Sequence, residues 1–106
     1  MTSSDESLSC SDNAGRHRFE LHVAGQLAAY AEYNVLKNGL LLTHTEVLPA
    51  FEGRGIGSAI ARHALESARQ QSLSVIPVCQ FMAAFLRKHP EYQDLVTLEN
   101  RRAFRI

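Results

Sequence analysis

The segment Gly53-Arg54-Gly55-Ile56-Gly57-Ser58, here called the glycine turn, is the part of the sequence that points most directly to chemistry. Glycine tolerates a positive φ and lets a ligand approach the main chain without meeting a Cβ atom. The first turn of a helix leaves amide groups unpaired, and the helix dipole adds partial positive charge there. Arg54 contributes a side-chain cation and Ser58 a hydroxyl. The turn therefore predicts a phosphate or pyrophosphate site, and a tight strand-to-helix turn that binds nothing is the alternative.

Two other phosphate-binding loops do not fit this segment. The Walker pattern requires a lysine before its Ser or Thr, and Gly57-Ser58-Ala59 has none. The dinucleotide-binding fingerprint requires a glycine at position 60, where Ile60 stands, and a parallel strand-helix-strand start.

His44 and Glu46 are polar residues in a strand pattern that otherwise indicates core. Two residues apart, they project from the same face, with Cα atoms roughly 6–7 Å apart. An imidazole and a carboxylate so placed could share a water or an amine and remove its proton. The alternative is that they pair with neighbouring elements or lie on a solvated face.

Cys79 follows an apolar strand pattern and begins the last predicted helix. A thiol at a helix N-terminus is favoured as the thiolate, which is a nucleophile. Free cysteine is also among the most buried residue types and often only packs. His17, His22 and His63 lack the spacing of metal ligands, and we expect no metal.

The elements that position these residues follow from the hydrophobic period. Alternation around Phe19, Leu21 and Val23 predicts a strand, and Asn38-Gly39 predicts a tight hairpin turn. From Arg54 to about Ser72, apolar residues recur every three or four positions, as in an amphipathic helix. We expect strands near 18–23, 27–35, 40–47 and 73–78, helices near 54–72 and 80–88, and one short final strand near 95–98. This β-β-β-α-β-α order, an antiparallel meander followed by a crossover helix, a further strand and a C-terminal helix, indicates an α+β fold.

Length and composition set the context. The 106 residues suffice for one domain, and eleven basic residues balance eleven acidic ones. No net field favours nucleic acid, and no apolar run reaches the ~18 residues of a membrane span. We expect a disordered tail over residues 1–15, one domain over 16–106, a cytoplasmic location, and a monomer or weak dimer.

Several motifs in order resemble those of the GNAT N-acetyltransferases. Val47-Leu48-Pro49 and the glycine turn resemble the family's cofactor-binding motif, Q/R-x-x-G-x-G/A, although Glu52 stands where Gln or Arg is usual. Thr43 to Val47, Pro77-x-Cys79 with Phe81, and His89-Pro90-Glu91-Tyr92 resemble a subgroup of very small family members. The resemblance covers roughly residues 17–98.

The resemblance implies that acetyl-CoA lies in a V-shaped opening between two neighbouring parallel strands, here 40–47 and 73–78. The glycine turn would hold the pyrophosphate, and the main chain of Val47 and Leu48 would pair with the pantetheine arm. Pro77 supports such an opening independently, because a proline inside a strand is tolerated where ladder pairing is broken. Lys88 could reach a phosphate of coenzyme A.

The resemblance further implies transfer of acetyl to a primary amine by direct attack in a ternary complex. The candidate residues near the reacting end, which is the thioester end of the cofactor, are His44, Glu46 and Cys79. Cys79 would be a nucleophile, a neighbour of the thioester or a packing residue. Many family members protonate the departing thiolate with a tyrosine, where this chain has Phe85. The alternative function is a non-catalytic acyl-CoA-binding module with a regulatory or partner role.

Overall fold

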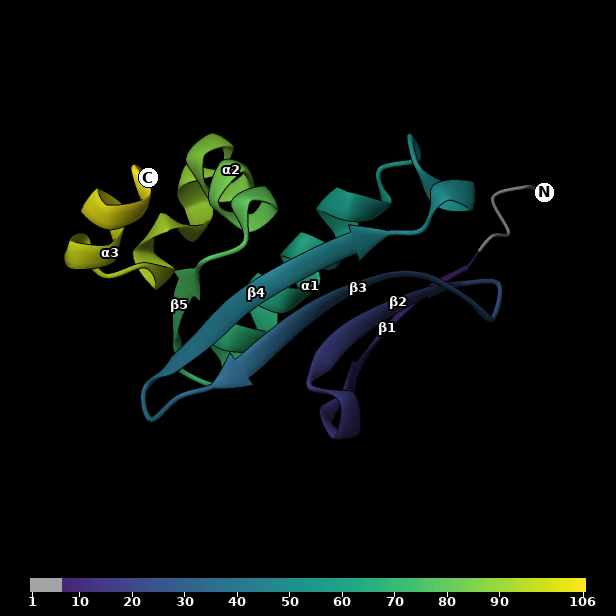
Figure 1. The fold of residues 1–106 in the computed structure, drawn as a ribbon, viewed down its shortest axis with the longest axis horizontal. Helices are drawn as coiled ribbons and strands as arrows, with labels where there is room; N and C mark the ends of the chain where they lie inside the picture. Colours follow the sequence, from purple (N-terminus) through teal and green to yellow (C-terminus); the bar gives the residue numbers. More distant parts are fainter. Residues whose placement is uncertain (1–6) are drawn as a thin grey trace.

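One mixed sheet of five strands, in the order β1-β2-β3-β4-β5, organises the molecule, as the computed structural model of residues 7–106 shows (Figure 1). β1 to β4 pair antiparallel, and β5 pairs parallel to β4. A parallel pair needs a crossover connection, which the first helix provides. The strands are β1 Leu8–Asn13, β2 Arg18–Val23, β3 Gln26–Val35, β4 Gly39–Val47 and β5 Ser74–Pro77.

Three α-helices complete the fold: α1 Ile56–Gln70, α2 Gln80–Lys88 and α3 Leu98–Phe104. Short 3-10 turns lie at η2 Ala14–Arg16, η3 Pro49–Phe51 and η4 Pro90–Leu95. α1 runs along one face of the sheet, behind β3 and β4 in Figure 1. Across residues 7–106, no helix is long and apolar enough to cross a membrane. The structure confirms the predicted α+β plan, and the β-β-β-α-β-α order holds from β2 to α2, with β1 before it and α3 after it.

The core lies between α1 and the sheet. The inner face of α1 buries Ile60 and Leu65 completely, with alanines between them. Ala29 and Ala31 of β3 are likewise fully buried in the same cluster. Because alanines lie on both surfaces, α1 can pack closely on the strands.

A β-bulge in β4 decides which side chains face the helices. Leu42 pairs with Tyr33, but the next pair joins His44 to Glu32, so Thr43 is an extra residue. The inner face therefore carries Leu42 before the bulge and Thr45 after it. Strict alternation would have placed even-numbered residues inward along the whole strand, and the sequence does not reveal this switch.

Two terminal segments differ from the sequence predictions. Leu8–Asn13 forms β1 along the edge of β2, where a disordered tail was expected over residues 1–15, because main-chain pairing does not require apolar side chains. Residues 1–6 of that predicted tail lie outside the described residues. The short strand expected near 95–98 is wrong: η4 runs to Leu95, and Thr97 caps α3 by accepting a hydrogen bond from the amide of Asn100.

A hydrogen bond from Tyr33 on β3 to the carboxylate of Asp12 ties β1 to the inner face of the sheet. Tyr33 is 6% exposed, and burial together with this bond raises its pKa to about 12. The pKa is raised on folding, so the contribution to stability is complete below about pH 10 and is lost as the pH rises towards 12.

We expect Tyr33→Phe to lower the free energy of unfolding by about 1 kcal/mol at neutral pH, because the buried side chain loses its hydrogen bond. Urea unfolding followed by circular dichroism measures the change, and the deficit should shrink above about pH 10. Tyr30→Phe, on the outer face of β3, is the matched control. Equal losses in both variants would contradict this role for the Tyr33–Asp12 bond.

Candidate functional site

β4 and β5 separate beyond Pro77, which creates an opening in the sheet. Their pairing begins at Gly39 and ends with Leu42 opposite Pro77, whereas β4 continues to Val47. The last main-chain link is the hydrogen bond from the amide of Cys79 to the carbonyl of Leu42, at 2.9 Å. After Pro77 the amide of Val78 turns back to the carbonyl of Ile76, at 3.1 Å, so the ladder ends where the sequence analysis expected broken pairing.

The glycine turn leads from the end of β4 into α1. Gly53 and Gly55 adopt φ values of +78° and +74°, and open space surrounds the position of a Cβ atom at either. Gly55 is the N-cap of α1, so no side chain of its own satisfies the first helical amides. The amides of residues 56–58 precede the first helical hydrogen bond, from Ala59 to Gly55, and point out of the helix. The turn therefore leaves these three amides facing outwards, with no side chain of the N-cap residue over them.

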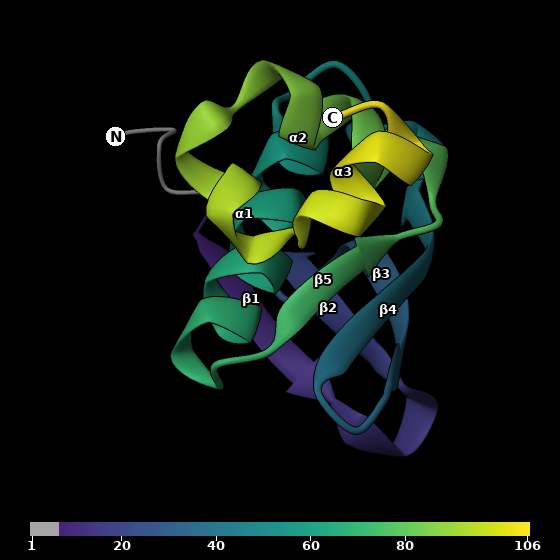
Figure 2. The same ribbon diagram turned by 90° about the vertical axis from the view of Figure 1, so that its left-hand side faces the viewer.

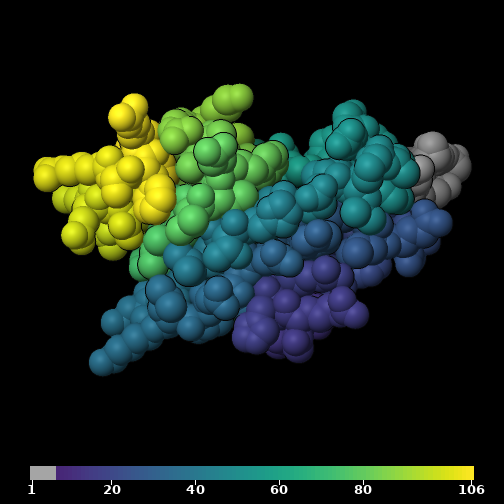
Figure 3. All heavy atoms as spheres, viewed as in Figure 1, coloured from purple at the N-terminus to yellow at the C-terminus, as the bar shows by residue number. Residues whose placement is uncertain are grey.

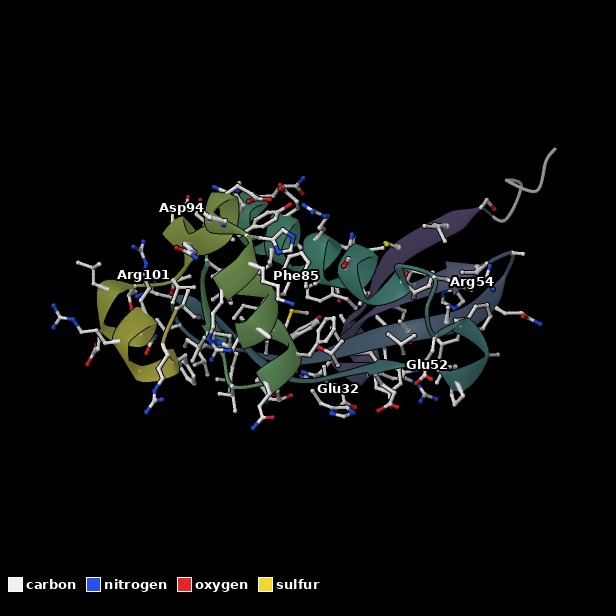
Figure 4. The ribbon with its side chains drawn as sticks, turned by 90° about the horizontal axis from the view of Figure 1, so that it is seen from above. Glu32, Glu52, Arg54, Phe85, Asp94 and Arg101 are labelled. Carbon is white, nitrogen blue, oxygen red and sulfur yellow. The ribbon has the colours of Figure 1, made fainter. Side chains whose placement is uncertain are left out.

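Figure 4 shows Arg54 and Glu52 together at the turn, at one end of the molecule. The guanidinium of Arg54 lies 5.4 Å from the centre of the Phe51 ring. Glu52, which departs from the usual cofactor motif, is exposed and follows the short helix η3. The guanidinium of Arg54 thus lies near the Phe51 ring, in the segment that precedes the amides of residues 56–58.

Gly57 lies where α1 and α2 meet, a contact that sequence reasoning missed. A Cβ atom at residue 57 would lie 2.9 Å from Cζ of Phe81 and 3.6 Å from a methyl carbon of Val47. Phe81, in the first turn of α2, is 40% exposed. The third glycine of the turn therefore makes room for this aromatic ring, and only the pairing of the two helices reveals it.

At the end of β4, the main-chain groups of one residue face β3 and those of the residue before it face the opening. The amide of Leu48 donates to the carbonyl of Ala28 at 2.8 Å, so Leu48 faces β3. Successive residues of a strand direct their main-chain groups to opposite edges, so those of Val47 point towards the opening. Of the two residues predicted to pair with a ligand, Val47 has its amide directed into the opening.

Cys79 lies at the opening, on the side of the sheet that faces the helices. It is the N-cap of α2, is 8% exposed, and its sulfur lies 3.4 Å from the hydroxyl of Thr45. Thr45 comes from the inner face of β4 after the bulge, and the sequence analysis did not select it as a site residue. The two side chains form the inner wall of the opening.

His44 and Glu46 do share a face, as predicted, and it is the face turned away from the helices. Nε2 of His44 lies 3.0 Å from a carboxylate oxygen of Glu46, and both side chains are about half exposed. In the antiparallel pairing of β4 with β3, His44 lies beside Glu32 and Glu46 lies beside Tyr30. These residues lie on the face of the sheet opposite to the buried face that carries Ala29. The structure thus joins His44 to Glu46 and places Cys79 on the other face of the sheet.

The outer face carries further charge next to this pair. Arg18 donates to the carboxylate of Glu20 at 2.8 Å and lies 4.5 Å from the centre of the Tyr30 ring. The hydrogen bond and charge of Arg18 hold the pKa of Glu20 below its usual range. The Arg18 charge is therefore largely balanced by Glu20. Among the described residues, no group of three or more His, Cys, Asp or Glu is placed to hold a metal ion.

Phe85 and Lys88 lie away from the turn. Phe85 is 6% exposed, with its ring stacked 3.9 Å from that of His89 and 5.5 Å from the guanidinium of Arg62. Lys88 is in the last turn of α2, about 10 Å along the helix axis from Phe81, which contacts Gly57. The structure does not bring Lys88 beside the glycine turn.

Comparison with known proteins identifies relatives over the same region. The family model described as GCN5-related N-acetyl-transferase matches residues 18–95, from β2 to η4. Protein NATD1 of Bos taurus is 34% identical to this chain over 58 residues, which is 55% of the chain and 51% of that protein. The chain therefore spans about half the length of this curated relative.

We expect Gly57→Ala to turn the Phe81 ring towards solvent while changing the free energy of unfolding by less than about 1 kcal/mol. Alanine is favoured over glycine in a helix by about 0.5–1 kcal/mol, and the partly exposed ring has space to move. NMR signals of the Phe81 ring and the Val47 methyl groups would report the displacement. In a Phe81→Ala background the same change should have little further effect on Val47. An unmoved Phe81 signal would contradict the contact.

Proposed function

The chain belongs to the GCN5-related N-acetyltransferase family, and on this premise we propose that it binds acetyl-CoA and transfers the acetyl group to a primary amine. The observation that carries the proposal is the set of unpaired amides at residues 56–58, which open directly beside the gap between β4 and β5. The two features together suit a ligand with a pyrophosphate at one end and an amide-bearing arm at the other.

Each part of the cofactor has a counterpart in the chain. The pyrophosphate accepts hydrogen bonds from the amides of Ile56, Gly57 and Ser58, with Arg54 as the nearby cation. The pantetheine arm follows the exposed main chain of Val47 into the opening. Phe81 lies where the arm passes between the two helices and covers it from the α2 side.

In the proposed reaction, the neutral amine attacks the carbonyl carbon of the thioester in a ternary complex. The C–N bond forms as the carbonyl becomes a tetrahedral oxyanion, and the C–S bond then breaks to release the thiolate of coenzyme A. The proton of the amine passes to the His44–Glu46 pair, directly or through one water. Cys79 and Thr45 border the reacting end from the helix side.

The departing thiolate does not need a proton from the helix. The side chain of Phe85 has no proton to donate, and it is enclosed by His89 and Arg62. A thiol has a pKa of about 8.5, so its thiolate is a tolerable leaving group near neutral pH.

Calorimetry with acetyl-CoA and with CoA tests the cofactor site. We expect both to bind the wild-type protein, and Arg54→Ala to weaken binding about tenfold, because a charge-assisted contact to phosphate is lost. Arg102→Ala, an exposed arginine of α3, is the control and should bind as the wild type does. An absence of binding at millimolar cofactor would refute the proposal.

Mass spectrometry of an amine panel tests the transfer. We expect cofactor-dependent acetylation above the non-enzymatic background, and a fall of about a hundredfold in kcat for Glu46→Gln near neutral pH. The deficit should narrow at higher pH, because more of the amine is already neutral. Binding without any turnover would favour the non-catalytic acyl-CoA-binding module.

The same assay separates the two roles of Cys79. In direct attack, Cys79→Ala retains turnover within about tenfold of the wild type, because the thiol forms no bond to the acetyl group. Complete loss of turnover, with an acetylated Cys79 trapped in the wild-type protein, would establish a covalent route instead.

A further inference from the structure

A hollow of about 490 Å³ lies on the side of α2 that faces α3. Figure 2 shows α3 lying near the end of β5 and in front of α2, and Figure 3 shows the surfaces of α2 and α3 next to each other at one end of the molecule. The hollow is bounded by the end of β5, one face of α2 and the end of α3. Its lining residues are Pro77, Val78, Gln80, Ala83, Arg87, Ala103, Phe104 and Arg105.

The lining is mainly polar, with a smaller apolar part and two arginines. Val78, Ala83 and Phe104 contribute apolar surface, and Arg87 and Arg105 are the basic residues of the lining. No acidic side chain belongs to the lining. The hollow therefore favours a ligand that carries negative charge and has a small apolar part.

The charge of Arg87 is oriented but not neutralised. Its Nε and Nη2 atoms donate to the main-chain carbonyls of Arg105 and Phe104, at 2.9 and 2.8 Å. These uncharged acceptors fix the guanidinium and the end of α3. Within residues 7–106, neither Arg87 nor Arg105 forms an ion pair with a carboxylate. Both cations thus remain available to an anionic ligand.

The hollow begins beside the opening of the sheet. Val78 and Gln80 line it, while Cys79 between them turns its sulfur to Thr45. Neighbouring Cα atoms are 3.8 Å apart, so one end of the hollow lies next to the segment between β5 and α2 that contains Cys79.

Resting on the proposed function, we propose that this hollow is the acceptor pocket and that the acceptor amine also carries a carboxylate. Its carboxylate binds Arg87 and Arg105, its apolar part packs on Val78 and Ala83, and its amine points towards the opening. Amino acids and short peptides have this chemistry. Polyamines do not, because their positive charges would face two guanidinium groups without a balancing carboxylate.

Leucine and leucinamide form a matched pair of test acceptors, since they share the amine and the apolar side chain and differ in the carboxylate. We expect Arg105→Gln to lower the ratio of kcat/KM for leucine to that for leucinamide about tenfold, through loss of a charge-assisted contact. Comparing this ratio between the variant and the wild type cancels the effect of the different basicity of the two amines. Arg102→Gln, on the same helix but outside the hollow, should leave the ratio unchanged. A ratio that Arg105→Gln does not alter would overturn the proposal.

A binding measurement distinguishes failure of this proposal from failure of the proposed function. Leucine added to the wild-type protein should shift the NMR signals of Val78, Ala83 and Ala103, and leucinamide should shift them less. If acetyl-CoA binds but leucine shifts none of these signals, the acceptor pocket is refuted and the cofactor site stands. If leucine binds and acetyl-CoA does not, the proposed function falls, and the assignment of the hollow to an acceptor falls with it.

Discussion

The ladder between β4 and β5 ends after four residue pairs, and the arrangement of the site depends on this ending. β5 ends at Pro77, where the amide of Val78 turns back to the carbonyl of Ile76, and β4 continues alone to Val47. Main-chain groups that a longer sheet would pair internally are thereby left facing an opening. A ligand with its own amides is the natural partner for such an edge, as an added strand would be in a binding groove.

The N-termini of α1 and α2 meet beside this opening. α1 begins at the glycine turn, α2 begins after Cys79, and the contact between Gly57 and Phe81 joins their first turns. Two sets of unpaired amides and two helix dipoles therefore face one region, which concentrates positive potential without requiring a high net charge. The proposed anion site therefore needs no excess of basic over acidic residues in the chain.

The bulge at Thr43 divides the polar residues of β4 between two faces. His44 and Glu46 lie on the outer, solvated face, and Thr45 lies with Cys79 towards the helices. In the proposed reaction the opening connects these faces, so that a proton can leave on one side while the thioester is held on the other. The hollow beside α3 adds a third element, cationic and partly apolar, next to the same strand end.

The sequence by itself determined the order of the elements, the turn and the point where pairing breaks, because each rests on local chemistry. α2 runs over Gln80–Lys88 as its apolar stripe and the following His89-Pro90 predict, and the helix after the glycine turn begins within two residues of its expected start. Only the tertiary structure decided what depends on neighbours distant in the chain. Three features arise from contacts between separate elements, and the hydrophobic period within one element does not predict such contacts. They are the inward direction of Thr45, the contact of Phe81 with Gly57, and the pairing of β1 with β2. The same holds for the hollow, because its arginines come from α2 and from the end of α3 and meet only when the chain has folded.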